Sequence, residues 1–365
     1  MHFFLSLILM LLPFAPPDKE QNDSIVRLMS AQSAEMFDDG TGHTFRKVIG
    51  PARFLHNNTY LVCDTALWDV DNKIINAFGN VQILQEETVL SSEKLDYFID
   101  RNTAEFRGAI VQLQDKDNNV LRTRSLDYNT KDSVAVFTRG GSMRDGSGQV
   151  IEGLNGTYDS KIKLFTFDER VNMFSDSVFV KTPYLIYRSN EGKAYFNQGV
   201  DAWKDENMLS SNAGYYSRPD STFFFTDKVH ATTATQEVWS DSAYVYRGQN
   251  NVLLLGNAQM KDSTRKVAAL ADYIFYEDSL SRVTLKKNAA LVAETEQNGT
   301  VDTIYVGAEK FIYQSVKKCD IDSVDIKNAA SRIEGMDVDP VKQYREKKSA
   351  EASSDEEEQE NAPAV

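Results

Sequence analysis

A tyrosine recurs in this 365-residue chain at an almost constant interval, and this periodicity constrains the fold more than any other feature. The column holds half of the chain's 16 tyrosines, at intervals of 31, 30, 29, 29, 30, 30 and 37 residues: Tyr97, Tyr128, Tyr158, Tyr187, Tyr216, Tyr246, Tyr276 and Tyr313. Stepping back by the same interval reaches Trp68 and Met36. Because a fixed period of about 20–50 residues is typical of repeat proteins, we expect about nine units of ~30 residues over residues 24–316.

A second column lies nine residues after each anchor and is mostly phenylalanine: Phe45, Ala77, Phe106, Phe137, Phe167, Phe196, Phe225, Leu255 and Leu285. Apolar residues alternate with polar ones around both columns, as in Leu95 and Tyr97. This alternation predicts β-strands, in which side chains two residues apart share a face. Turn formers such as Asp100-Arg101-Asn102 separate the two columns. Each unit is therefore expected to contain about three short strands.

Units of ~30 residues are too small to fold alone and are expected to stack. One unit of this kind cannot bury its apolar face, so neighbouring units must stack into an elongated array. No convincing helical period appears between Ser24 and Val316. The long last interval contains the polar stretch Glu294–Gly299, which we expect to form a longer loop. The sequence predicts an all-β, elongated repeat fold.

The two ends of the chain differ from the array. Phe3 to Phe14 is an almost wholly apolar run, too short to span a bilayer, which needs about 20 residues. We expect residues 1–20 to be a signal peptide. Residues 317–365 lack the aromatic columns and include the run Asp355–Glu358, so we expect a largely disordered acidic tail that is dispensable for folding.

Charge and motifs exclude several classes of function. The formal net charge of -14 argues against a nucleic-acid binder, which needs clustered lysine and arginine. The four histidines include no H-E-x-x-H and no pair at ligand spacing. The glycine-rich stretch 140–148 fits neither a phosphate-binding loop nor a nucleophile elbow. We therefore predict no catalytic residue, no metal and no cofactor.

Two cysteines exclude a disulfide-dense scaffold. Cys63 and Cys319 belong to the second and last units, so at ~4.8 Å per strand they should lie more than about 30 Å apart, far beyond the ~7 Å limit between the Cα atoms of a disulfide. We predict no bond between them within one molecule. Thiol labelling that found both blocked in a monomer, and freed together by reductant, would contradict an extended array.

Two segments carry a resemblance to a known family. They are Ser91-Ser92-Glu93-Lys94-Leu95-Asp96-Tyr97 followed by Ala104-Glu105-Phe106-Arg107-Gly108, and Tyr60–Trp68 followed by Ala77-Phe78-Gly79-Asn80-Val81. Their pattern resembles the OstA-like proteins of lipopolysaccharide transport, which include LptA, LptC and the N-terminal part of LptD. The resemblance covers about residues 24–316. The chain is longer than a single-domain member of that family and lacks the outer-membrane barrel of LptD.

The resemblance implies a β-jelly roll, or β-taco, with open ends and an apolar lumen that holds the acyl chains of lipopolysaccharide. It implies a location in the periplasm, in possible association with the outer membrane, and docking by edge strands onto like-folded transport proteins or a head-to-tail copy of the chain. The residues expected to line the lumen are Leu95, Tyr97, Phe106, Leu126, Tyr128, Phe137, Tyr158, Phe167, Leu185, Tyr187, Phe196, Tyr216, Phe225, Tyr246, Leu255, Tyr276 and Leu285. Among these, Phe167, Phe196 and Phe225 are expected to contact acyl chain in mid-array.

An alternative function remains open at this point. A closed β-solenoid would bury the same columns as dry core and act as a surface adhesin or carbohydrate-binding protein through exposed aromatic residues. Co-purified lipid A would favour the transport protein, whereas clean protein that binds glycans would favour the adhesin.

Overall fold

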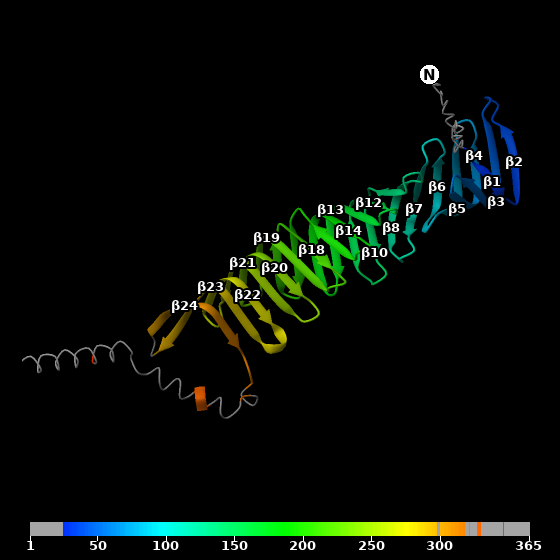
Figure 1. The fold of residues 1–365 in the computed structure, drawn as a ribbon. Helices are drawn as coiled ribbons and strands as arrows, with labels where there is room; N and C mark the ends of the chain where they lie inside the picture. The colour runs from blue at the N-terminus through cyan, green and yellow to red at the C-terminus, as the bar shows by residue number, and fades with distance from the viewer. Residues whose placement is uncertain (1–24, 298–299, 318–320, 322–326, 330–345, 347–365) are drawn as a thin grey trace, which may run out of the picture.

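The computed structural model describes residues 25–297, 300–317, 321, 327–329 and 346, and its sheet of 24 strands lies between Arg27 and Gln314. The strands stack across the long axis of an elongated, twisted roll, with β1 at one end and β24 at the other (Figure 1). The first twelve strands are β1 (Arg27–Ser30), β2 (Ser33–Asp38), β3 (Thr44–His56), β4 (Thr59–Asp69), β5 (Ile74–Gln85), β6 (Thr88–Phe98), β7 (Thr103–Gln114), β8 (Val120–Asn129), β9 (Val134–Phe137), β10 (Gly141–Arg144), β11 (Val150–Gly153) and β12 (Asn155–Asp159). The others are β13 (Leu164–Ser175), β14 (Val178–Arg188), β15 (Lys193–Phe196), β16 (Val200–Lys204), β17 (Asn207–Ser211), β18 (Ala213–Ser217), β19 (Thr222–Thr232), β20 (Gln236–Tyr246), β21 (Asn251–Asp262), β22 (Val267–Glu277), β23 (Arg282–Gln297) and β24 (Thr300–Gln314).

Every pairing between these strands is antiparallel, and nearly every long strand has a break in register near its middle. In the β13–β14 pair, residues 164–168 lie opposite 184–188, the register then shifts, and 171–175 lie opposite 178–182. Such a β-bulge bends the strand. The long strands therefore fold at the bulge, and each contributes one half to each of two walls.

The broken strands in the middle of the chain separate the two walls. One half of β8 pairs with β9, whereas the other half pairs with β10. From there β9 pairs with β12, and β10 pairs with β11, until β13 joins both sets again. We call the half containing 126–129 and 164–168 the first wall, and the half containing 120–123 and 171–175 the second wall. The line of bulges between them is the crease.

Two bulges of the crease carry a local Gly-Asn motif. Gly79 and Gly256 have φ of +72° and +73°, and Asn80 and Asn257, which follow them, both have φ of +44°. A Cβ atom at Gly256 would lie 2.4 Å from Oδ2 of Asp241, an oxygen that accepts a hydrogen bond of 2.9 Å from Nδ2 of Asn257. Glycine adopts this backbone conformation without strain and permits the close approach of Asp241.

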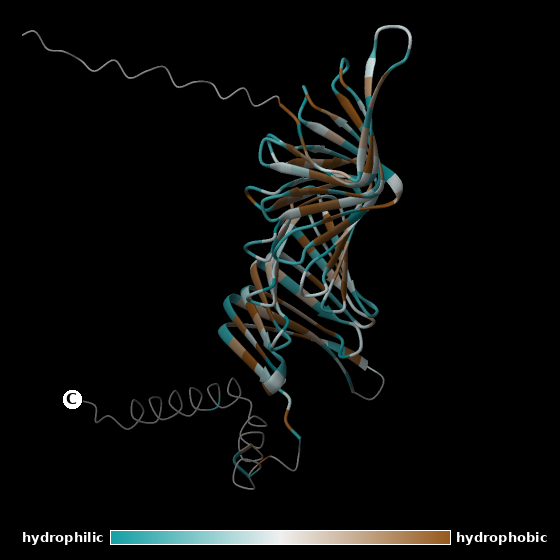
Figure 2. Cartoon of the chain, turned by 90° about the vertical axis from the view of Figure 1, so that its right-hand side faces the viewer, coloured by the Kyte–Doolittle hydropathy of each residue, from teal (hydrophilic) through white to brown (hydrophobic). Residues whose placement is uncertain are grey.

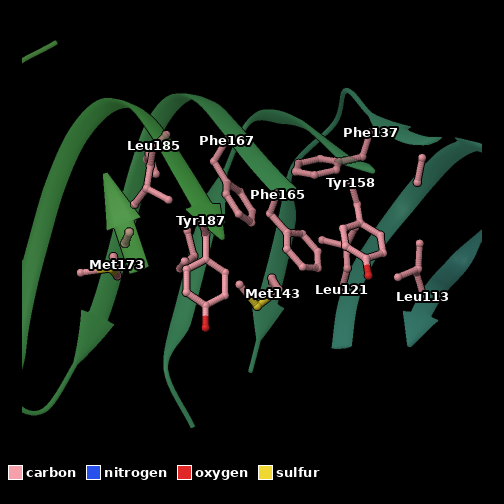
Figure 3. Packing of buried hydrophobic residues seen from close by; sticks show 14 of the residues in the cluster. Leu113, Leu121, Phe137, Met143, Tyr158, Phe165, Phe167, Met173, Leu185 and Tyr187 are labelled. Atoms are coloured by element: carbon pink, nitrogen blue, oxygen red, sulfur yellow. The ribbon is translucent and has the colours of Figure 1, made fainter. Parts of the chain in front are cut away.

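The core lies between the walls and is continuous along the roll. Hydrophobic and hydrophilic residues alternate along the strands (Figure 2), and the inward set includes Tyr97, Tyr128, Phe106 and Phe196, each at most 2% exposed. In the middle of the roll, Phe165 stacks on Tyr158 with 4.0 Å between ring centroids (Figure 3). This packing is that of a protein interior.

Two expectations about local structure are wrong. Most units contain long bent strands rather than three short ones, because the chain stays hydrogen-bonded through the crease instead of stopping there. The polar stretch after residue 293 is not simply a longer loop, since residues 294–297 pair with 300–303 and extend the β23–β24 hairpin. Between residues 25 and 317, the one helical element in the described residues is a short 3₁₀ turn, Asp278–Leu280; residues 327–329 beyond the sheet are helical.

Candidate apolar cavity

The interior of the roll changes from packed to open toward the C-terminus. A cavity of about 1000 Å³ lies between the walls over strands β14 to β24. Its lining is mainly aliphatic and aromatic, with Val245, Leu254, Met260, Ile274 and Phe311 among the lining residues. Several of these side chains are only partly buried, whereas the inward residues of the central units are fully buried. The cavity is therefore an open continuation of the core.

Hydrogen bonds from the tyrosine column close the central part of the roll opposite the crease. Each tyrosine sits at the edge of the first wall, and its hydroxyl meets a residue at the edge of the second wall, either at the end of a strand or in the turn that follows. The five contacts join Tyr97 to His56 (2.6 Å), Tyr128 to Gln85 (2.8 Å), Tyr158 to Asp115 (2.9 Å), Tyr187 to Asp145 (2.8 Å), and Tyr216 to Asp176. We call this row of contacts the seam.

Asp145 is the most elaborate partner in the seam. Its side chain is 1% exposed and accepts hydrogen bonds from the Tyr187 hydroxyl and from the backbone N–H groups of Ser147 and Gln149, besides pairing with Arg218. A buried carboxylate needs such partners because it loses its hydration. Asp145 thus links the turn of one wall to Tyr187 and Arg218 at the edge of the other.

The seam ends after Tyr216. The next inward residue at this edge of the first wall is Val245, which has no hydroxyl, and Tyr276 instead donates a hydrogen bond of 2.9 Å to Asp278 beside it. Both residues line the cavity. The walls are therefore not joined by the tyrosine contacts where the cavity lies.

Burial of the seam tyrosines has a consequence at alkaline pH. Desolvation raises the pKa of Tyr97 and of Tyr216 to about 12, each from a usual value near 10. The folded state therefore keeps these protons while the unfolded chain loses them. We expect stability to be unaffected by these groups below about pH 10 and to fall as the pH rises from about 10 to 12. Urea unfolding across this range should show the decrease, and a flat profile would contradict the buried seam.

The Tyr187→Phe substitution tests the seam directly. It removes one hydroxyl from the buried Asp145 and should lower the free energy of unfolding by about 1–3 kcal/mol. The matched control is Tyr276→Phe, whose hydroxyl contacts only the exposed Asp278; it should change the free energy of unfolding by less than about 0.5 kcal/mol. Equal effects of the two substitutions in urea titrations would show that the seam does not stabilise the fold.

The structure divides the residues expected to line a lumen into three groups. Twelve point inward into the closed, packed part: Leu95, Tyr97, Phe106, Leu126, Tyr128, Phe137, Tyr158, Phe167, Leu185, Tyr187, Phe196 and Tyr216. Phe225, Tyr276 and Leu285 line the cavity. Tyr246 and Leu255 lie on the outer face.

The inward placement expected for Tyr246 and Leu255 is wrong by one residue. Val245 lies opposite the inward Phe223 and Val252, and Leu254 follows in the same inward row, so their neighbours Tyr246 and Leu255 face out. The units vary between 29 and 31 residues in the tyrosine column. Since a shift of one residue reverses the face of a strand, the spacing alone could not fix this unit.

The structure places the three mid-array phenylalanines in two environments. Phe167 and Phe196 are 0% exposed and packed in the core, whereas Phe225 lines the cavity. Their contact with acyl chain stays a prediction. The sequence pattern missed Leu254 and Met260, which also line the cavity and lie in neither column. Their period-2 relation to Val252 and Ala258 was the available signal.

Charged groups in the cavity lie near its margins. Asp262, at the end of β21 and the edge of the second wall, pairs with Arg265 at 2.8 Å, and both line the cavity. Hydrogen bonds from the Arg265 backbone and the Gln236 side chain lower the pKa of Asp262 to about 2. Arg247, near the first-wall edge, donates to the backbone oxygen of Asp176. The apolar interior is thus bordered by ionised groups.

One cluster of potential metal ligands was not anticipated from the sequence. Ligand atoms of His43, Asp69 and Asp71 lie within 4.8 Å of one another near the N-terminal end. Asp71 accepts a hydrogen bond from the Thr44 backbone, and Asp69 accepts two from Asn72. Local turn structure accounts for these positions. In the described part of the chain, no helix is both long and apolar enough to cross a membrane.

The class of protein follows from these features: an all-β roll with a closed centre and an apolar cavity at one end. A sequence profile of the OstA-like proteins matches residues 24–183 and 151–240, together more than half of the chain. The chain therefore belongs to the OstA-like family.

Comparison with solved structures gives a distant match. The crystal structure of LptH, the LptA-homologous periplasmic component of the lipopolysaccharide transport device of Pseudomonas aeruginosa, has 12% sequence identity and a TM-score of 0.21. The match covers 38% of this chain and 81% of LptH. None of the curated proteins compared with this chain matches it significantly.

Proposed function

We propose that this protein is a periplasmic lipopolysaccharide-binding transport protein, and that its C-terminal cavity holds the acyl chains. Membership of the OstA-like family supports the transport role. The observation that carries the proposal is the apolar cavity of about 1000 Å³, which is at the upper end of the range of roughly 300–1,000 Å³ for small-molecule sites.

The chemistry of the lining suits a hydrocarbon ligand. Burial of an apolar chain yields about 0.8 kcal/mol per methylene, so about ten methylenes would contribute roughly 8 kcal/mol before the cost of restricting the chain. The charged Arg247 and Arg265 at the margins would remain available to a phosphorylated head group. Binding would thus need no specific polar contact deep in the cavity, and transport would need no chemistry from this chain.

The ends of the roll offer edges to partners. Residues of β1 and β2 are exposed throughout. In the described part of the chain β24 pairs only with β23, and it exposes Val301, Ile304 and Tyr305. Unpaired edges accept another strand by β-augmentation. We propose that like-folded transport proteins, or a second copy head to tail, dock there.

The proposal also assigns the parts of the chain. About nine units over residues 24–316 form an open-ended roll, and residues 1–20 direct export. Residues 1–24 and most of the tail lie outside the described residues.

Lipid analysis of the purified protein tests the function. Mass spectrometry after extraction should find lipid A species bound to protein isolated from a lipopolysaccharide-producing host. Protein isolated in folded form without lipid, and unable to bind added lipopolysaccharide, would contradict the proposal.

A further inference from the structure

One hydrogen-bonded row on the outer face of the first wall changes its chemistry halfway along the roll. In the N-terminal half, consecutive paired positions carry Asn76, Asp96, Glu105, Asp127, Val136, Thr157 and Thr166, and Ile186 then precedes Tyr195. In the C-terminal half, the same row carries Tyr195, Tyr215, Phe224, Tyr244, Leu253 and Phe275. We call these six residues the outer track. The first half shows that the fold itself does not require aromatic residues in this row.

Four neighbouring rings of the outer track form a continuous row, and Leu253 separates them from Phe275. Ring centroids lie 6.1 Å apart between Tyr195 and Tyr215, 5.2 Å between Tyr215 and Phe224, and 4.6 Å between Phe224 and Tyr244. All six side chains are partly exposed. They do not line the cavity, which lies on the other face of the same strands. Neither the core nor the cavity therefore explains them.

Polar groups run beside the track at the crease. Nδ2 of Asn212 donates to Asp227 at 2.8 Å, Nδ2 of Asn257 to Asp241 at 2.9 Å, and Nδ2 of Asn288 to Asp272 at 2.8 Å. Asp241 is three residues from Tyr244 on β20, and Asp272 is three residues from Phe275 on β22. The aromatic row is thus accompanied by carboxylate and amide groups on β19, β20 and β22 and their neighbours.

We propose that the outer track binds a linear chain of pyranose sugars. The flat face of a sugar ring presents weakly positive C–H groups, which suit the negative faces of tyrosine and phenylalanine rings. The sugar hydroxyls can donate hydrogen bonds to the carboxylates at the crease and can exchange hydrogen bonds with the tyrosine hydroxyls. Neighbouring strands are ~4.8 Å apart, so successive side chains of the track are spaced by roughly the length of one sugar ring along a linear glycan.

Size and charge favour a glycan over other occupants. Six side chains of about 200 Å² each, only partly exposed, offer on the order of 300 Å². A stable protein interface buries about 800 Å² per partner, so the exposed area of the track is too small to bind a protein partner. The neighbouring Asp227, Asp241 and Asp272 would repel an anionic membrane or nucleic acid, whereas they accept hydrogen bonds from neutral hydroxyl groups.

Calorimetric titration of the full chain with lipid-free glycans tests the proposal. The probes are cellohexaose, chitohexaose and the polysaccharide released from lipopolysaccharide by mild acid. We expect at least one to bind, and the Tyr215→Thr/Tyr244→Thr double variant to bind it at least tenfold more weakly. Threonine is the residue at two positions of the same row in the N-terminal half, so the sheet should tolerate it.

Two controls separate the alternatives. Phe174→Thr alters an exposed aromatic residue of the second wall and should leave glycan binding unchanged. Val245→Asp alters the cavity and should also leave glycan binding unchanged. Failure of the lipid-binding proposal is therefore distinguishable from failure of the glycan-binding proposal. Absence of binding to all three probes at millimolar concentration would overturn the proposal. The proposal would also be overturned if sedimentation velocity showed that the wild-type protein self-associates and that the Tyr215→Thr/Tyr244→Thr double variant does not.

Discussion

The Phe196→Asp protein is expected to lose the fold of the middle of the roll. Phe196 is 0% exposed in the packed part of the interior. Removing a buried phenylalanine costs about 3–5 kcal/mol, and an unpaired carboxylate in the same place costs more, against a typical total stability of about 5–15 kcal/mol. Circular dichroism and limited proteolysis should show an unfolded central segment.

The control for this variant is Phe174→Asp, at a position that is 53% exposed on the outer face. It should retain the fold, because an exposed charge keeps its hydration. A Phe196→Asp protein with the thermal midpoint of wild type would mean that the interior at this position is hydrated or open, and would contradict the closed centre.

The Val245→Asp protein is expected to fold but to lose lipid. Val245 is partly buried, lines the cavity and stands where the seam has ended. A carboxylate there would lie against the hydrocarbon chain and lose hydration without a partner. We expect at least a tenfold decrease in lipopolysaccharide bound per molecule, measured by mass spectrometry after extraction, with an unchanged circular dichroism spectrum.

The neighbouring Tyr246→Asp provides a matched control. Tyr246 stacks on Tyr244 on the outer face, with 6.1 Å between ring centroids. The same charge, one residue away but on the other side of the sheet, should leave lipid binding unchanged. If Tyr246→Asp lost lipid and Val245→Asp did not, the strand register described here would be contradicted.

The sequence predicted the architecture but not the state of its interior. The alternation around Tyr97, Phe106 and Tyr187 was sufficient for an elongated all-β repeat, because period 2 places these residues on one face. It could not show that Tyr187 reaches Asp145, which is 42 residues away in the chain. That contact depends on the bend at the crease, and the bend has no strong sequence signal apart from Gly-Asn at two sites.

The cavity could not be predicted from the sequence for a related reason. Whether facing apolar side chains meet or leave a cavity depends on the distance between the walls, and the repeat is nearly the same in both halves. The informative difference is the exchange of an inward tyrosine for Val245. The spacing concealed this exchange, because Tyr246 stands beside Val245 and continues the column on the opposite face.

Photo-crosslinking to lipopolysaccharide tests the central claim most directly. A benzoylphenylalanine would replace Phe311 or Tyr276 in the cavity, and Phe224 or Tyr246 on the outer face, in otherwise identical proteins. The proposal predicts adducts with the lipid A portion at the two cavity positions and no adducts with that portion at the two outer positions. Lipid A adducts of equal yield at all four positions, or at the outer positions alone, would contradict the assignment of the cavity as the acyl-chain site.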